Sequence, residues 1–392
     1  MRAVPQPHAA RIATATLFAV NGGAAANWIV RIPAVQEELD LSTGTLGVAL
    51  LGIAVGSLFS MPPTGWLVAK IGSRPVSYGM ALALCAALPL PALAPGLLGL
   101  VGALVLLGVG MGGLDVAMNA QGVTVQRRYD RPIISSFHAL FSLGGLVGSA
   151  MGGLIAELGV DPLPHLLGVA IVSACIVVLV SRWLLPGSAD AVSHGPMIAR
   201  PSRALAALGI LAFCVLMAEG AMADWTAVYL RRTVETGPGL AAAGYAVFSL
   251  TMAAGRLAGD PLVARFGLIL PVRLGGIAAA FGLGLALITA ETITSLIGFG
   301  LVGLGLSFTF PIVLTAASRT PGMAPSVAIA AISTAGYLGF LVGPPLIGLA
   351  GELLTLRGGL VLVVGLGIVI ATLSHAVTRH DEASSSATMP PA

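Results

Sequence analysis

Apolar runs long enough to cross a membrane recur along this 392-residue chain, and they constrain its fold more than any other feature. A helix needs about 20 apolar residues to span the hydrocarbon core of a bilayer. Twelve stretches meet that length, at residues 12–30, 44–66, 76–94, 97–120, 135–157, 165–185, 204–226, 239–259, 271–290, 294–316, 325–349 and 358–378. The sequence therefore predicts an all-α integral membrane protein with twelve transmembrane helices.

The composition excludes several functional classes. Charged residues make up 9% of the chain, whereas soluble domains carry about 25%. This excludes a soluble enzyme, a nucleic-acid-binding protein and a disordered scaffold. Cys85, Cys175 and Cys214 all lie inside apolar runs and form neither a disulfide pattern nor a metal-binding spacing. Phosphate-binding loops, zinc motifs and nucleophile elbows are also missing from the sequence. We therefore expect neither an enzyme nor a bound cofactor.

The distribution of basic residues predicts how the chain lies in the membrane. Cytoplasmic loops of membrane proteins are enriched in lysine and arginine. If the N-terminus is cytoplasmic, only four of the 19 basic residues fall outside, namely Arg31, Arg231, Arg232 and Arg357. We therefore predict a multi-pass protein of the bacterial inner membrane with both termini in the cytoplasm. Because the first run is too long for a signal peptide, we predict that it is an uncleaved helix.

The two halves of the sequence resemble each other at an offset of 195 residues. Residues 143–148 correspond to residues 338–343, and the match continues from Glu157 to Glu352. Parallel repeats of this kind are typical of transporters that hold a solute between two halves. We predict an N-terminal six-helix half at 1–185, a cytoplasmic linker at 186–203, a C-terminal six-helix half at 204–378 and a disordered cytoplasmic tail at 379–392.

Several short patterns resemble the major facilitator superfamily of membrane transporters. Residues 65–74, GWLVAKIGSR, resemble its loop signature G-x-L-x-D-R-x-G-R-R, and residues 144–153 are similar to its antiporter-associated pattern G-x-x-x-G-P-x-x-G-G. Residues 28–33, 137–142 and 219–225 look closer to a bacterial branch of fucose-permease-like and MosC-type membrane proteins. The resemblance implies two rocking halves that expose a central site alternately to each side of the membrane.

The loop signature implies a cytoplasmic gate. In this chain the gate would involve Gly65, Lys70, Gly72, Arg74, Asp260 and Arg265, and Arg256 would join Asp260 in its second network. The aspartate of the signature is Ala69 here, so the gate must use another acid or close less firmly. The alternative interpretation is that these basic residues have no gating role and only reflect the usual enrichment of positive charge in cytoplasmic loops. Ser149 replaces the proline of the antiporter pattern, and this departure weakens an assignment as a drug exporter.

Titratable side chains inside the apolar runs are the candidates for proton coupling. They are Glu219, Asp115, Asp224 and His138. Acids within a membrane are rare and are usually functional. Glu219 is the leading candidate because it falls just past the middle of its run. Asp115 shares a helical face with Asn119, four residues further on. The alternatives are structural hydrogen bonds for the carboxyl groups and an ordinary interface position for His138.

Polar and aromatic residues in the apolar runs are candidates for the wall of a solute cavity. They are Asn21, Asn27, Trp28, Asn119, Trp225 and Tyr337. Asn27-Trp28 and Asp224-Trp225 occupy equivalent places in the repeat at an offset of 197 residues, so the two rings could stack on a sugar or another ring-bearing solute. The alternative for both tryptophans is an aromatic belt at the membrane interface.

Glycines spaced four residues apart predict close contacts between helices. The candidate seam glycines are Gly144, Gly148, Gly152, Gly339 and Gly343. Packing is the first interpretation, and a seam along which the halves rock would follow from it. Pro311, Pro344 and Pro345 should bend the helices that contain them.

Together these features predict a proton-coupled secondary transporter of a small organic solute. One alternative is an exporter of a drug-like compound or secondary metabolite by proton antiport. A third possibility is a membrane sensor that binds a solute without moving it. The expected partners are the solute, protons and the lipid bilayer, and we expect a monomeric chain without nucleic acid.

Overall fold

The computed structural model describes residues 6–129, 133–186, 203–320, 323 and 325–377, and these residues form a helical bundle without β-strands. The prediction of an all-α membrane protein is therefore confirmed. The predicted linker lies outside the described residues except at its two ends, and the predicted tail lies wholly outside them.

The N-terminal half contains six long helices. They are α1 (Pro7–Glu38), α2 (Thr43–Ile71), α3 (Ser73–Ala87), α4 (Leu97–Gln126), α5 (Ile134–Glu157) and α6 (Pro162–Ser181). A short 3-10 segment, η1 (Leu90–Leu93), extends α3. The first helix runs eight residues beyond its predicted end at residue 30, so Arg31 lies inside a helix rather than in the predicted loop.

The C-terminal half repeats this arrangement. Its helices are α7 (Arg203–Arg232), α8 (Pro238–Phe266), α9 (Ile269–Thr289), α10 (Thr292–Leu306), α11 (Thr309–Ser318), α12 (Pro325–Leu353) and α13 (Leu356–Leu373), followed by the 3-10 segment η3 (Ser374–Val377). Helices α10 and α11 together make the tenth predicted span. The break falls at Ser307 and Phe308, because the ring nitrogen of Pro311 cannot donate to the carbonyl four residues earlier.

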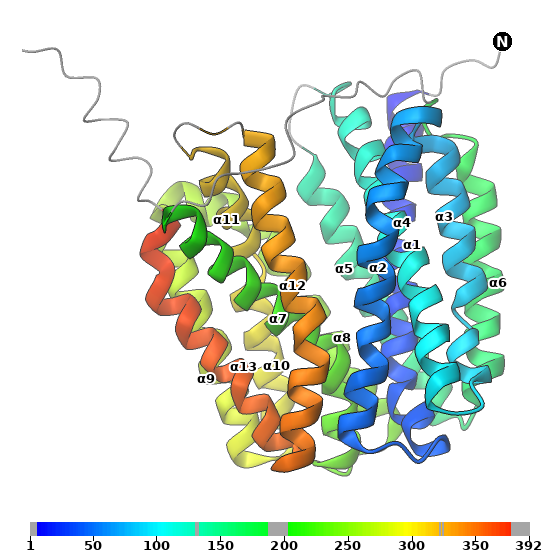
Figure 1. Cartoon of the computed structure of the whole chain (residues 1–392), viewed down its shortest axis with the longest axis vertical. Coiled ribbons are helices and arrows are strands. Elements are labelled where there is room, and N and C mark those ends of the chain that lie inside the picture. Colours follow the sequence, from blue (N-terminus) through cyan, green and yellow to red (C-terminus); the bar gives the residue numbers. More distant parts are fainter. Residues whose placement is uncertain (1–5, 130–132, 187–202, 321–322, 324, 378–392) are drawn as a thin grey trace, which may run out of the picture.

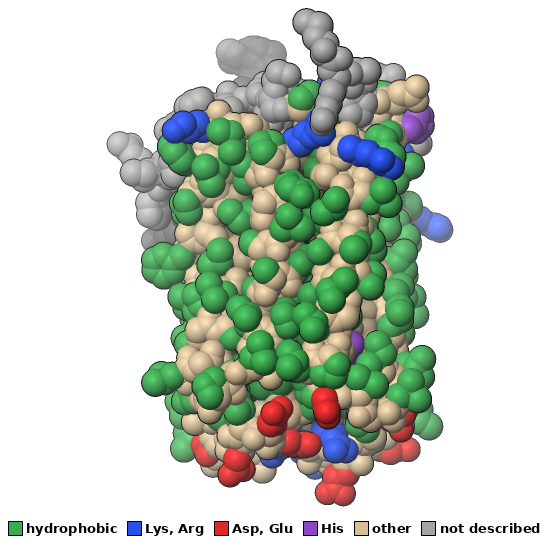
Figure 2. Space-filling view, turned by 90° about the vertical axis from the view of Figure 1, so that its right-hand side faces the viewer, with side chains coloured by type: hydrophobic (Ala, Val, Ile, Leu, Met, Phe, Trp, Pro, Cys, Tyr) green, Lys and Arg blue, Asp and Glu red, His purple; other side chains and the backbone are tan. Residues whose placement is uncertain are grey.

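Eleven spans among the described residues are long and apolar enough to cross a membrane. Helix α1 is the twelfth long helix of the bundle, with 32 residues. It is less apolar than the others because Asn21 and Asn27 interrupt its apolar stretch. The sides of the bundle carry leucine, isoleucine, valine and phenylalanine in contact with the surroundings, as a lipid-facing surface requires (Figure 2).

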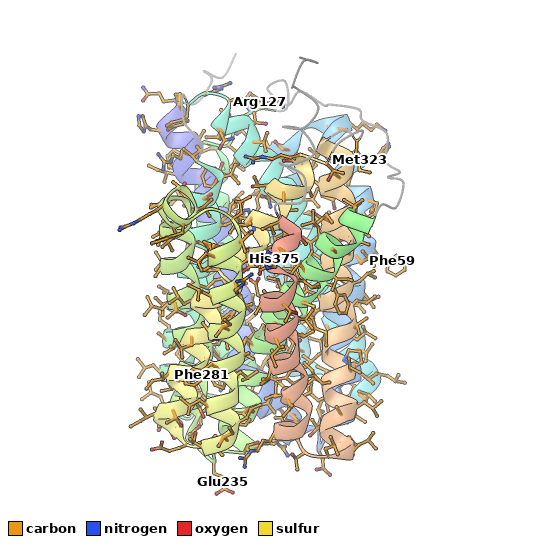
Figure 3. All side chains as sticks on the ribbon, turned by 90° about the vertical axis from the view of Figure 1, so that its left-hand side faces the viewer. Phe59, Arg127, Glu235, Phe281, Met323 and His375 are labelled. Atoms are coloured by element: carbon orange, nitrogen blue, oxygen red, sulfur yellow. The ribbon has the colours of Figure 1, made fainter. Side chains whose placement is uncertain are left out.

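The two ends of the bundle carry side chains of opposite charge. Figure 2 shows acidic side chains gathered at one end, and Figure 3 places Glu235 at that end and Arg127 at the opposite one. We call the first the acidic end; it carries Glu37, Glu157, Glu235, Glu291 and Glu352. We call the second the basic end; it carries Lys70, Arg74, Arg127 and Arg182. The two halves lie side by side, and their ribbons converge at the acidic end (Figure 1).

The predicted seam glycines lie at helix contacts within each half. A Cβ atom on Gly144 would overlap the carbonyl oxygen of Ala19, so α5 can approach α1 this closely only because residue 144 has no side chain. Likewise, a Cβ atom on Gly339 would overlap the carbonyl oxygen of Phe213 and separate α12 from α7. Gly148 and Gly152 continue the first contact, and Gly343 continues the second.

Other glycines form the contacts between the halves, which run along α5 with α8 and along α2 with α12. A Cβ atom on Gly47 would lie 2.6 Å from the carbonyl oxygen of Pro344, and one on Gly153 would lie 2.6 Å from the Cβ atom of Ala242. These contacts, rather than the predicted seams, join the halves.

Candidate functional site

A cavity of about 240 Å³ lies between the two halves. Helices α1, α2, α4 and α5 line it from one half, and α7, α8 and α12 line it from the other. Six of the predicted site residues are in its wall, namely Asn21, Trp28, Asp115, Glu219, Asp224 and Tyr337. These residues come from four helices, so the fold brings together side chains that lie more than 300 residues apart in sequence.

Asp115 and Tyr337 connect the halves across the cavity. The Tyr337 hydroxyl donates to Asp115 Oδ2 at 3.2 Å. The amide of Asn119, one turn further along α4, donates to Asp115 Oδ1 at 3.1 Å, as the predicted shared face requires. The carboxylate thus accepts from both halves, and separation of α4 from α12 would break one of its bonds.

Arg256 of α8 makes a second polar connection between the halves. Its guanidinium donates to Glu219 Oε1 at 3.2 Å, and both side chains are about one-fifth exposed. The same guanidinium donates to the Ser142 hydroxyl at 2.8 Å and reaches the backbone oxygen of His138 at 3.5 Å. From the sequence, Arg256 was predicted to be a cytoplasmic basic residue that forms a second gating network with Asp260. Its ion pair with the leading coupling candidate is visible only in three dimensions.

Three other polar groups in the cavity wall have no protein partner. Among the described residues, no side chain or backbone group bonds the carboxylate of Asp224. Asn21 Oδ1 and Trp28 Nε1 are buried in the wall and also lack a hydrogen-bond partner. A buried polar group without a partner costs about 1–3 kcal/mol. Because these three groups lie in the cavity wall, they are candidates for hydrogen bonds to a solute.

Asn27 does not line the cavity; it belongs to a buried hydrogen-bond network between α1 and α6. Arg31 Nε donates to His165 Nδ1 at 2.7 Å, and His165 Nε2 lies 2.8 Å from Asn27 Oδ1. Because Nδ1 accepts, Nε2 carries the ring proton and donates to the amide oxygen. Arg31 also donates to the backbone oxygen of Val160 at 2.7 Å. The predicted boundary at residue 30 hid this network, since it left Arg31 in a loop.

The other predicted residues lie outside the cavity wall. Trp225 is fully buried within the C-terminal half. His138 packs the edge of its ring against Phe18, with ring centroids 5.2 Å apart. Asn119 lies behind Asp115 and supports its carboxylate.

The predicted gate residues lie at the basic end of α2 and α8. Lys70 stacks on the ring of Trp66, and Arg265 stacks on that of Phe266. Arg74 donates to the backbone oxygen of Arg182 at 3.3 Å. Each of these contacts stays within its own half.

Glycines end the helices next to these gate residues. Gly72 and its repeat partner Gly267 have φ of 88° and 72°, a region that favours glycine. A Cβ atom on Gly65 would meet open space. The side chain of Asp260 lies outside the described part of the structure.

Polar contacts at the acidic end join the halves. Glu157, the last residue of α5, accepts at 2.8 Å from the backbone N–H of Gly239 in the first turn of α8. Glu352, near the end of α12, accepts at 3.0 Å from the backbone N–H of Gly44 in the first turn of α2. Arg231 and Glu37 add an ion pair at 3.5 Å.

Comparisons with known proteins agree with this architecture. An uncharacterized MFS-type transporter of Yersinia pestis is 36% identical over 369 residues, which cover 94% of this chain and 96% of the relative. The membrane protein MosC of Rhizobium meliloti is 31% identical over 372 residues, covering 94% of this chain and 90% of the relative.

Two solved structures share the fold at low sequence identity. A bacterial homolog of the human lysosomal transporter Spinster, in an inward-facing and unoccupied conformation, aligns with a TM-score of 0.75 at 13% identity and covers 97% of this chain and 98% of its own. A mutant form of the nucleoside transporter NupG aligns with a TM-score of 0.73 at 14% identity and covers 94% of this chain and 99% of its own. The family profile described as Major Facilitator Superfamily matches residues 12–344, and the chain is a membrane transporter that belongs to this superfamily.

Proposed function

We propose that this transporter carries a small organic solute across the bacterial inner membrane by alternating access coupled to protons. The observation that supports this most directly is the cavity between the halves, whose wall contains carboxylates from α4 and α7.

The structure fits a state that faces the cytoplasm. Positive charge favours the cytoplasmic side of a membrane, so we assign the basic end, and with it both termini, to the cytoplasm. The acidic end then faces outward, where Glu157, Glu352 and the Arg231–Glu37 pair hold the halves together. A solute in the cavity would leave or enter between the diverging basic ends.

Proton coupling would act through Glu219. With its carboxylate charged, Glu219 holds the guanidinium of Arg256, which also contacts Ser142 and the backbone of His138 in the other half. Protonation of Glu219 removes the negative partner of Arg256 and loosens this connection. A proton on Glu219 would therefore favour separation of α8 from α5, and Asp115 with Tyr337 forms the second connection that must open.

The test is proton movement driven by solute in liposomes that contain the purified protein. A thermal-stability screen against sugars, polyols, amino acids and antibiotics first supplies a transported compound, since a ligand at 100 times its Kd adds about 2.7 kcal/mol of stability. Glu219→Gln should keep solute counterflow and lose solute-driven proton flux. The matched control is Glu235→Gln at the exposed acidic end, which should keep both. Unchanged proton flux in Glu219→Gln would contradict the assignment.

A further inference from the structure

The charged groups of the cavity wall point to a class of solute. Three carboxylates line the cavity, namely Asp115, Glu219 and Asp224, and no lysine or arginine is among the described lining residues. Asp115 is satisfied by Tyr337 and Asn119, and Glu219 is paired with Arg256. Asp224 is the carboxylate that remains available, and an unpaired charge in a partly buried wall is unfavourable without a partner.

The uncharged groups near Asp224 define the rest of the solute. Asn21 Oδ1 is a second unused acceptor, and Trp28 Nε1 is an unused donor seven residues along the same helix; both side chains are at least 97% buried. Seven residues are nearly two turns, so the two groups lie on the same face of α1. The remaining wall is mostly aromatic or aliphatic, with side chains such as Phe141, Tyr245 and Phe340, and its one described serine, Ser57, already donates to the backbone oxygen of Gly108.

We propose that the solute is a small organic amine. Its ammonium group binds the carboxylate of Asp224, and its apolar or ring-shaped body packs against the aromatic wall. Asn21 and Trp28 bond a further polar group on that body. This inference rests on the proposed transport function and specifies its substrate class. An anion would meet three carboxylates without a lining base, and a neutral solute would leave Asp224 without a countercharge.

Matched probes that differ only in charge test the proposal on the purified full-length chain. One set is 2-phenylethylamine, 2-phenylethanol and phenylacetate; the other is glucosamine, glucose and gluconate. We expect the amine of at least one set to bind at least tenfold more tightly than its neutral and acidic partners. Asp224→Asn should abolish this preference, whereas Asp161→Asn, at an exposed helix start, should keep it. Equal binding of a neutral or acidic partner, or thermal stability unchanged by every amine, would overturn the proposal.

Counterflow in liposomes separates this inference from the transport proposal. Counterflow of a neutral or acidic compound that binds best would refute the amine and leave transport standing. Binding of an amine that depends on Asp224, without counterflow of that amine, would support the solute class and refute transport.

A separate observation concerns the acidic end. Glu157 and Glu352 are 195 residues apart, and so are the glycines that they contact, Gly44 and Gly239. Each carboxylate belongs to one half and accepts from the first turn of a helix in the other half. Glutamate is favourable there because the N-terminus of a helix carries partial positive charge. Gly239 also lets its carboxylate approach, since a Cβ atom there would lie 3.0 Å from Glu157 Oε2.

We infer that these contacts act as two equivalent glutamate latches, Glu157 on Gly239 and Glu352 on Gly44, which hold the acidic end closed. Opening on this side requires both N–H groups to exchange a carboxylate for water. Because the latches lie on opposite sides of the seam, each should contribute independently to the closed state.

Distances between spin labels at Glu38 and Glu235, on exposed positions of opposite halves, test the latches in a variant without the native cysteines. We expect Glu157→Ala and Glu352→Ala each to raise the ratio of the long-distance to the short-distance population about two- to fivefold, and their effects to multiply in the double variant. Asp161→Ala, at the same end without a contact to the other half, should leave the ratio unchanged. An unchanged ratio in the double variant would overturn the inference.

Discussion

A double-mutant cycle, in which the charges of Arg256 and Glu219 are removed singly and together, measures the free energy of interaction between these two side chains. At 3.2 Å and an effective dielectric constant near 20, the attraction between the charges is about 5 kcal/mol, before the loss of hydration offsets part of it. Each single variant, Arg256→Gln or Glu219→Gln, leaves the other charge partly buried without its partner, and we expect a loss of about 3 kcal/mol in the free energy of unfolding. The double variant should lose no more than the worse single variant.

These values predict a coupling energy of about 3 kcal/mol or more. The measurement is unfolding by sodium dodecyl sulfate in mixed micelles, followed by tryptophan fluorescence, for the parent and the three variants. The pair of Arg231 and Glu37 provides the matched control, because its side chains are 36% and 46% exposed and its coupling should be about 0–1 kcal/mol. A coupling within about 0.3 kcal/mol of zero for Arg256 and Glu219 would refute the ion pair as a connection that holds the cavity wall together.

Four further variants, one of them a matched control, test separate parts of the bundle by the same unfolding measurement. Gly144→Ala should destabilise by about 1–3 kcal/mol, because its methyl group would overlap a backbone oxygen of α1. Gly343→Ala should change stability little, because its methyl group would lie at ordinary contact distances of 3.4 and 3.7 Å from atoms of Met217. Tyr337→Phe should lose about 1 kcal/mol with its bond to α4. His165→Ala should lower the free energy of unfolding by about 2–4 kcal/mol, because it leaves Arg31 Nε and Asn27 Oδ1 of α1 buried without this hydrogen-bond partner. A loss below about 0.5 kcal/mol for Gly144→Ala or His165→Ala would contradict the close contact of α5 with α1 or the buried network of His165, respectively.

The fold was predictable because the membrane demands long apolar helices. All twelve predicted runs correspond to helices of the bundle, and the break between α10 and α11 falls four residues before the proline that was expected to bend that span. The end of α1 was not predictable from apolarity. Arg31 looked like a loop residue, yet Arg31 is satisfied inside the bundle by His165, a partner 134 residues away.

The sequence predicted which polar residues lie within the membrane, but it did not predict which side chains they contact. Polar residues within apolar runs identified Asp115, Glu219 and Asp224, because a charge in hydrocarbon needs a cavity or a partner. The sequence alone does not tell which helix a side chain faces. For that reason Arg256 was counted among the inner basic residues, and Trp225 was expected near a cavity that only Trp28 reaches.

The contacts that join the halves follow the internal repeat, whereas the residues proposed to contact the solute do not. A contact made across a pseudo-twofold axis occurs twice, and the contacts of Glu157 and Glu352 are such a pair. The cavity follows no such rule. The position equivalent to Asp115 is Phe310, and at the offset of 197 residues that relates α1 to α7 the position equivalent to Glu219 is Gly22. The contacts that close the acidic end occur once in each half because the two halves are related by the repeat. A small solute has no twofold symmetry, so the charged residues proposed to contact it can differ between the halves. Charges that lack a repeat partner are therefore the ones to test for coupling and recognition.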